Sequence, residues 1–232
     1  MRLLAIDTAS ARCSAALWSD GALVLRAVAT QREHAQLLLP MIQSLLDEAG
    51  IGFDALDAIA FGRGPGSFTG LRVAASVAQG LAIGAGVPVV PVSDLRALAL
   101  QGHRLAVERG VLPRGAPATV AVCLDARMSE VYAGAFAIPA GGLPGDAPES
   151  VCAPETFRPV GPCHVAIGPG FGAYAPALES IAAHAALVLP DSEPCATDIA
   201  ILGAADFAVG GGRDADAALP VYLRDNVARP TA

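Results

Sequence analysis

The sequence contains no lysine, because all 15 of its basic residues are arginine. This absence excludes the sites that need a lysine amine: the phosphate-binding lysine of a P-loop, the ATP-binding lysine of a protein kinase and a Schiff-base lysine. The chain also lacks the Gly-x-Gly-x-x-Gly fingerprint that opens a helix in dinucleotide-binding domains. Both common sequence motifs for binding a nucleotide are therefore missing.

Cysteines are few and show no paired spacing. The five are odd in number and contain no Cys-x-x-Cys motif, which argues against a disulfide framework and against a zinc knuckle. Asp7 interrupts the apolar run that starts at Leu3, so we expect no secretory signal and predict a cytoplasmic protein with reduced thiols. The uncharged stretch 73–93 is long enough to cross a membrane, but its glycines and two prolines favour a helix followed by a buried strand. We expect no membrane association.

Charged residues make up only 16% of the chain and give it a formal net charge of −7, whereas 53% of the residues are hydrophobic. That share of apolar side chains can bury a sizeable core. Nucleic acids are bound mainly through cationic contacts to phosphate, so the acidic balance argues against RNA binding by this chain alone. If RNA is involved, we expect a partner protein to supply the basic surface.

The stretch Gly-Arg-Gly-Pro-Gly-Ser-Phe-Thr-Gly-Leu-Arg, residues 62–72, is the most distinctive in the chain. It follows an apolar run that ends at Phe61, and Ser67 is a suitable N-cap, so we predict a strand, a tight loop and a helix over 67–82. Glycines allow close backbone approach and leave the N–H groups of a helix start unobstructed. The loop could bind an anion, with Arg63 and Arg72 beside it, or lay the helix against a flat surface.

The predicted helix carries small or apolar side chains around most of its circumference, with Arg72, Ser76 and Gln79 as a narrow polar line. A helix of this kind is buried on more than one side. We predict that one side faces the core and that another binds a homologous subunit or a second copy of this chain; the alternative is that all of it is core. The predicted partner-binding residues are Gly66, Thr69, Gly70, Arg72, Val73, Ser76, Val77 and Gly80.

Hydrophobic periodicity predicts the succession βββαβαβα twice. In the first half, strands are predicted at 3–6, 14–18, 22–29, 58–61 and 87–92, and helices at 33–49, 67–82 and 94–107. In the second half, strands are predicted at 119–124, 131–138, near 150–152, 164–167 and 186–189, and helices from 154, at 174–183 and at 197–209. We therefore predict an α/β protein with two lobes, residues 1–108 and 109–232, each built on a mixed sheet. Residues 219–226 are expected to pack as an extended tail.

Four motifs together resemble the bacterial TsaB (YeaZ) family. They are the stretch at 62–72, Leu-Ala-Ile-Asp-Thr-Ala at 4–9, Leu-Asp-Ala-Arg-Met-Ser-Glu-Val-Tyr at 124–132 and Pro-Val-Tyr-Leu-Arg at 220–224. The resemblance implies an actin, sugar-kinase and Hsp70-like (ASKHA) fold, and a non-catalytic role in making threonylcarbamoyladenosine (t6A) on tRNA as partner of a catalytic TsaD-type subunit. It further implies a TsaE-type ATPase as a partner, a homodimer when the chain is isolated, and contact with tRNA only through the complex.

The repeated order places Asp7 and Asp125 at matching positions, each just past the first strand of its lobe. In ATP-using ASKHA proteins, aspartates there hold magnesium or activate a nucleophile, and a nearby glycine lets the hairpin cradle phosphate. Here residues with side chains follow both aspartates and fill that space. We interpret both as turn-forming residues, with a weak nucleotide contact as the alternative. Gly168 and Gly170, where the fold's adenosine contact would lie, are interpreted in the same two ways.

No residues combine into a catalytic or metal site. His34 is the single histidine in the stretch where the family's catalytic relative has a paired-histidine metal site, so we interpret it as a helix-start or surface residue. Gly-x-Ser-x-Gly is absent, and Ser67 is explained as an N-cap. We predict no catalytic residue, no metal and no cofactor of its own, and leave open a nucleotide at the interface of a complex. The alternative function is a stand-alone ATP-dependent phosphotransferase or ATPase with Asp7 or Asp125 as the catalytic carboxylate.

Overall fold

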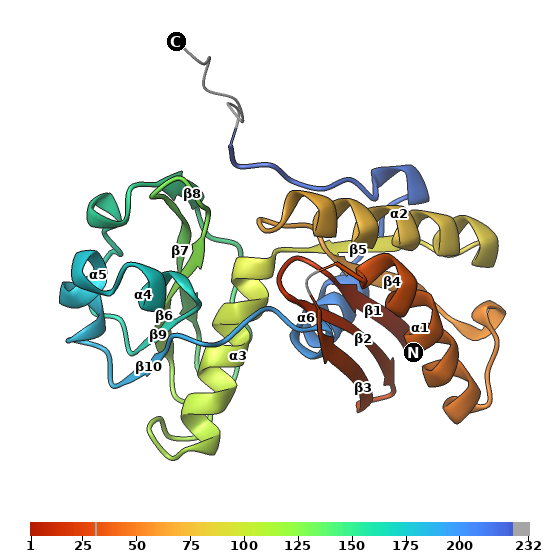
Figure 1. Ribbon diagram of the computed structural model, residues 1–232. Helices are drawn as coiled ribbons and strands as arrows, with labels where there is room; N and C mark the ends of the chain where they lie inside the picture. Colours follow the sequence, from red (N-terminus) through yellow and green to blue (C-terminus); the bar gives the residue numbers. More distant parts are fainter. Residues whose placement is uncertain (31, 225–232) are drawn as a thin grey trace, which may run out of the picture.

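The computed structural model describes residues 1–30 and 32–224 and has two lobes, each built on a five-stranded mixed sheet (Figure 1). The first sheet has the order β3-β2-β1-β4-β5 and comprises β1 (Arg2–Asp7), β2 (Arg12–Ser19), β3 (Ala22–Ala29), β4 (Ala58–Gly62) and β5 (Val89–Val92). The second has the order β10-β9-β6-β7-β8, which matches the first when it is read from the β8 edge. It comprises β6 (Ala118–Asp125), β7 (Val131–Ile138), β8 (Glu149–Cys152), β9 (Val165–Ile167) and β10 (Leu187–Leu189). In the order of the chain, the first three strands of each sheet pair antiparallel, and the last two run parallel to the first. This confirms the predicted ASKHA-like fold.

Alternation of apolar residues along β1 lets the first sheet bury both of its faces. Leu4 and Ile6 point to the face covered by α1 (His34–Ala49) and α2 (Phe68–Ala85). Leu3 and Ala5 point to the opposite face, where α6 (Ala196–Ala208) packs. The first strand is therefore the centre of a three-layered lobe.

Helix α3 (Asp94–Glu108) lies between the two sheets (Figure 1). Its residues Leu95 and Leu98 join the core of the second sheet, whereas Ala97 and Leu100 join the core of the first. Two ion pairs hold α3 to α6: Arg96 with Asp206 at 2.6 Å and Arg104 with Asp198 at 2.9 Å.

The position of α6 departs from a simple division of the chain into two halves. It follows the whole second sheet in the sequence, yet it packs against β1, β2 and β4 of the first. Gly203 permits this close approach, because a Cβ there would lie 2.6 Å from that of Ala60. The boundary between residues 108 and 109 stays a prediction.

The second lobe has less helix than its sequence order predicts. Where α1 covers the first sheet, the second lobe has a single 3₁₀ turn, Pro154–Thr156. The prolines and glycine that follow that turn, at 159, 161 and 162, do not support a longer helix. The remaining helices are α4 (Gly170–Ala173) and α5 (Ala175–Ala182), and further 3₁₀ turns occupy Phe53–Ala55 and Ala215–Ala217.

Helix α2 begins at the predicted N-cap and runs to Ala85, three residues beyond the predicted end at 82. The Ser67 hydroxyl accepts the N–H of Gly70 at 3.4 Å as an N-cap, and Gly86 closes the helix in the left-handed conformation. Within the described residues, α2 is the one helix that is long and apolar enough to cross a membrane, and it contributes Leu71, Ala75 and Ala82 to the buried interior.

Candidate functional site

The two aspartates end the first strand of each lobe and make the same local hydrogen bond. Asp7 Oδ1 accepts the N–H of Ala9 at 2.7 Å, and Asp125 Oδ1 accepts the N–H of Arg127 at 2.8 Å. Each carboxylate thus closes its own turn two residues ahead, which confirms the turn-forming interpretation. The side chain of Asp125 also accepts the hydroxyl of Tyr174 at 3.0 Å.

Asp7 has a second, buried partner that sequence reasoning missed. Asp94, at the start of α3, lies against Asp7, and both side chains are fully buried. Burial raises the pKa of Asp7 to about 6, and burial together with the neighbouring Asp7 carboxylate raises the pKa of Asp94 well above its usual range. Two neighbouring buried carboxyls therefore titrate as a coupled pair. Ser93 is the N-cap of α3, and Asp94 beside it makes a separate contact: its Oδ2 accepts the N–H of Gly64 at 2.5 Å.

The glycine loop between β4 and α2 packs directly onto the turn between β1 and β2. The N–H of Ser67 donates to the carbonyl of Ala9 at 2.7 Å, and the Thr8 hydroxyl donates to the carbonyl of Gly70 at 2.7 Å. A Cβ on Gly70 would lie only 1.8 Å from the Thr8 carbonyl oxygen. The glycines therefore seat α2 against the first hairpin, which favours the flat-surface interpretation of this loop over an anion site.

Burial divides the eight predicted partner-binding residues. Gly70 is buried, Gly66, Val73 and Val77 are half-buried, and the others are exposed. The exposed ones are Thr69, Arg72, Ser76 and Gly80, which recur at three- and four-residue spacing and continue to Ile83, 68% exposed. We call this line, residues 69, 72, 76, 80 and 83, the outer face of α2.

The alanines of α2 that could admit a second helix face inward, whereas Gly80 lies on the outer face. Ala74 and Ala78 are completely buried, and Ala75 is 3% exposed. They pack against the protein's own β-sheet and neighbouring helices, so the closest approach that they permit is made within the chain.

The end of the described chain crosses from the first lobe to the second. The N–H of Val221 donates to the carbonyl of Arg63 in the glycine loop at 2.7 Å, and the ring of Tyr222 lies 5.5 Å from that of Phe68. Arg224 donates to the carbonyl of Ala126 at 3.0 Å. Residues 219–224 contain no helix or strand, as predicted for the tail, and residues 225 and 226 of the predicted tail lie outside the described residues.

The β6–β7 hairpin is strained where the tail meets it. Arg127, Met128 and Ser129 have φ values of 61°, 55° and 61°, a left-handed conformation that costs free energy in residues other than glycine. The guanidinium of Arg224 donates to hairpin carbonyls and forms an ion pair with Glu130. The tail therefore stabilises an unusual hairpin conformation.

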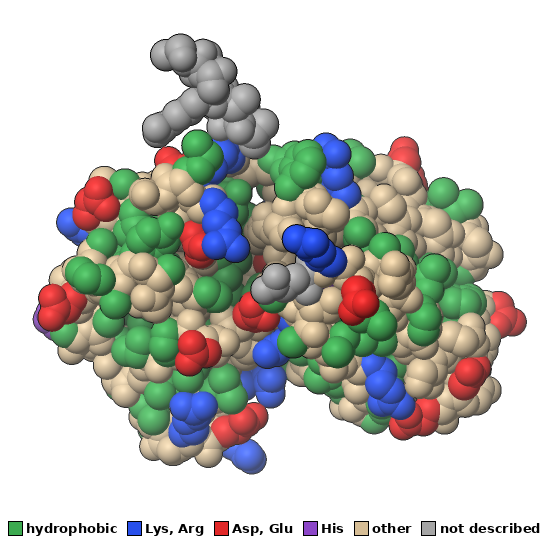
Figure 2. All heavy atoms as spheres, in the orientation of Figure 1, with side chains coloured by type: hydrophobic (Ala, Val, Ile, Leu, Met, Phe, Trp, Pro, Cys, Tyr) green, Lys and Arg blue, Asp and Glu red, His purple; other side chains and the backbone are tan. Residues whose placement is uncertain are grey.

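A cleft of about 790 Å³ lies between the lobes and is lined by both hairpins, the glycine loop and the tail. Figure 2 shows this hollow with charged side chains around its rim. Gly168 and Gly170, where the adenosine contact of the fold would lie, pack against β6. A Cβ on Gly168 would lie 2.3 Å from the Cys123 carbonyl oxygen, and a Cβ on Gly170 would lie 2.7 Å from the Cβ of Cys123. Pro169 between them does line the cleft.

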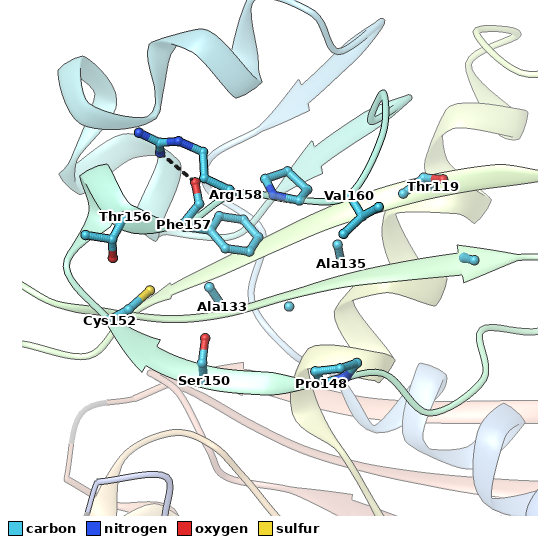
Figure 3. Close-up of a pocket in the computed structure, with 13 residues that line it drawn as sticks. Thr119, Ala133, Ala135, Pro148, Ser150, Cys152, Thr156, Phe157, Arg158 and Val160 are labelled. Carbon is cyan, nitrogen blue, oxygen red and sulfur yellow. Dashed lines mark hydrogen bonds between the residues drawn. The ribbon is translucent and has the colours of Figure 1, made fainter.

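A second cavity, of about 540 Å³, lies over β7 and β8, where the second lobe has no counterpart of α1 (Figure 3). Its lining is small and mostly apolar, with Ala133, Ala135 and Phe157 beside Ser150 and Cys152. Among the described residues that line it there is no carboxylate or histidine, and its charged member is Arg158.

Histidine and cysteine provide no metal site in the part of the chain that the structure describes, since no three histidine, cysteine or acidic residues are grouped to hold an ion. His34 opens α1, as predicted, and its Nε2 lies 3.0 Å from the carbonyl of Ser10. All five cysteines are free thiols.

Known proteins resemble this chain over most of its length. A family model described as "TsaD: tRNA N6-adenosine threonylcarbamoyltransferase" matches residues 28–164. The tRNA threonylcarbamoyladenosine biosynthesis protein TsaB of Escherichia coli K12 is 37% identical over 98% of this chain and 96% of its own, and that of Haemophilus influenzae is 45% identical over 57% of this chain and 52% of its own. The crystal structure of YeaZ from Pseudomonas aeruginosa superposes with a TM-score of 0.84, at 40% identity, over 96% of this chain and 99% of that one.

Proposed function

Because the chain belongs to the TsaB family, we propose that it is a non-catalytic subunit of t6A synthesis that docks on, and supports, a catalytic TsaD-type subunit. The observation that carries this proposal is the packing of the glycine loop onto the first hairpin. The N–H of Ser67 and the space beside Gly70 are both used within the chain, and the neighbouring Asp7 is enclosed with Asp94. These contacts within the chain use groups of the loop that could otherwise approach a phosphate, whereas the outer face of α2 remains accessible.

The match to the TsaD-type family model supports a homologous partner. It covers residues 28–164, and so includes α1, α2 and the glycine loop. Two homologous subunits that meet through equivalent helices form a nearly twofold interface. The same face of α2 would then pair two copies of this chain when the partner is absent.

The proposed complex also contains tRNA and an ATPase, and the charge of this chain indicates how the tRNA would be bound. A chain with a net charge of −7 gains little from direct contact with tRNA, so the TsaD-type subunit would supply the cationic surface. A TsaE-type ATPase would provide nucleotide hydrolysis in the cytoplasm, and any nucleotide near this chain would lie at the interface of the complex. A stand-alone ATPase is not favoured, because side chains occupy both hairpins.

Reconstitution tests the proposal. Purified TsaD-type and TsaE-type subunits with tRNA, ATP and a threonylcarbamoyl donor should modify tRNA only when this chain is added. The chain alone should hydrolyse ATP no faster than buffer. Equal modification without the chain would contradict the supporting role. ATP turnover by the pure chain that disappears in Asp7→Asn would establish the alternative function instead.

A further inference from the structure

Arg72, on the outer face of α2, is held between two exposed aromatic rings. Its guanidinium carbon lies 3.8 Å from the ring centre of Phe68 and 6.0 Å from that of Tyr222. Its Nε donates to the Tyr222 hydroxyl at 3.0 Å. Phe68 is 51% exposed and Tyr222 is 43% exposed, in a chain with only 5% aromatic residues. Large aromatic side chains left this accessible in a stacked cluster are typical of binding surfaces.

The stack leaves the ends of the guanidinium unused. Arg63, Arg127 and Arg224 on the same side of the molecule form ion pairs with Glu149, Asp125 and Glu130. Arg72 forms none within residues 1–30 and 32–224, and its terminal nitrogens make no hydrogen bond there. A planar guanidinium with free N–H groups is suited to bidentate binding of a carboxylate.

We infer that Arg72 is the anchor of the α2 surface and binds a carboxylate side chain of the TsaD-type subunit; this inference rests on the proposed function. The rings of Phe68 and Tyr222 fix the guanidinium before the partner arrives, which lowers the entropy cost of binding. Arginine and tyrosine at the centre of an interface commonly contribute most of its binding energy.

The surroundings of Arg72 favour a protein carboxylate over an RNA phosphate. Beyond Arg72, the outer face of α2 continues through uncharged Ser76 and Gly80 to Ile83, whose exposed side chain offers apolar area to a protein surface. Arg63, Arg127 and Arg224 are already paired with carboxylates, so they add no free cations beside Arg72. RNA binding depends on several such cations acting together.

The tail is what fixes the second ring of the stack. Tyr222 lies between Val221, which is bound to the glycine loop, and Arg224, which is bound to the β6–β7 hairpin. The segment is thus attached to both lobes and carries Tyr222 across to α2. We assign to Tyr222 a positioning role toward Arg72.

Isothermal titration of the full chain with the TsaD-type subunit tests the inference. Arg72→Ala should weaken binding about thirtyfold or more, and Arg72→Lys about tenfold, because an ammonium group does not reproduce the planar fork. Tyr222→Ala should also weaken binding, and the double variant should bind no worse than Arg72→Ala, because both residues act through one contact. Arg114→Ala, which removes an exposed arginine from the loop before β6, is the matched control and should bind as the wild type does.

The outcomes separate this inference from the function on which it rests. Failure of the wild-type chain to bind the subunit would remove the proposed function. If the wild-type chain binds the subunit and Arg72→Ala, shown to be folded by circular dichroism, binds it with the same affinity, the role of Arg72 alone is overturned. If Arg72→Ala instead weakens retention of tRNA by the isolated chain and leaves subunit binding unchanged, the occupant is a phosphate and the inference is wrong.

Discussion

The carboxyl groups of Asp7 and Asp94 lie against each other in the buried interior, where β1 ends and α3 begins. Asp7 Oδ2 and Asp94 Oδ1 have no hydrogen-bond donor among the described residues, whereas the other oxygen of each carboxyl binds a backbone N–H, from Ala9 and Gly64 respectively. The pair therefore links the first hairpin to the loop that precedes α2.

The paired carboxyls make stability depend on pH. Their pKa values are raised in the folded state, so the folded protein holds protons that the unfolded chain has lost, and its stability falls as the pH rises from about 4 through the pKa of about 6 of Asp7. Asp94→Asn supplies a neutral N–H donor to Asp7 at every pH. We expect it to flatten this dependence and to raise the free energy of unfolding at pH 8 by about 1 to 3 kcal/mol.

Urea unfolding between pH 4.5 and 8 measures the effect. Arg12 and Glu193 act on Asp7, and Arg63 and Glu149 act on Asp94, so these groups must be kept unchanged in the comparison. A variant whose stability keeps the wild-type slope over this range would show that the raised pKa values of the pair do not cause the pH dependence.

The glycines of α2 serve different purposes, and two of them make a matched test. A methyl group at Gly70 would collide with the Thr8 carbonyl oxygen, whereas one at Gly80 meets nothing within 4 Å. Gly70→Ala should therefore destabilise the protein by about 2 to 4 kcal/mol. Gly80→Ala should stabilise it by up to about 1 kcal/mol, since alanine is the better helix former. Thermal unfolding of both variants measures the two changes in stability. A similar change in both would contradict the packing of α2 on the hairpin.

Local patterns in the sequence were enough for most of the elements and for the two turn-forming aspartates, but not for the helix expected from 154. Alternation predicted the strands, Ser67 predicted the start of α2, and the repeated order placed Asp7 and Asp125 in equivalent hairpins, because each of these depends on residues close together in the chain. The family resemblance supplied the ASKHA assignment and the TsaD-type partner that we propose.

Features that depend on distant neighbours were not predictable in the same way. The contact of Arg72 with Tyr222 joins residues 150 positions apart, and the pairing of Asp7 with Asp94 depends on how α3 is placed between the sheets. The small residues of α2 illustrate the limit: their spacing indicates close packing, but an apolar stripe does not specify whether its own core or a partner covers it. The structure assigns Ala74 and Ala78 to the core.

Arg224 is expected to be the residue that maintains the left-handed hairpin at 127–129. Its guanidinium donates to the carbonyls of Ala126 and Arg127 and pairs with Glu130. Arg224→Ala should cost about 1 to 3 kcal/mol of stability and should accelerate hydrogen exchange of the hairpin amides. Arg114→Ala serves as the control for removal of an arginine. Unchanged exchange in the hairpin would mean that its own hydrogen bonds are sufficient.

The burial pattern of α2 yields the sharpest test of its role as a docking surface. Ser76 is exposed on the outer face and Ala74, two residues earlier, is completely buried. Ser76→Arg should leave the isolated chain folded and reduce its affinity for the TsaD-type subunit at least about a hundredfold, because an unpaired charge is forced into the contact. Ala74→Arg should instead prevent folding, since the charge would enter the core. Circular dichroism distinguishes the two variants, and size-exclusion chromatography with the partner measures association. A Ser76→Arg chain that is folded and still forms the complex would place the interface elsewhere on the molecule.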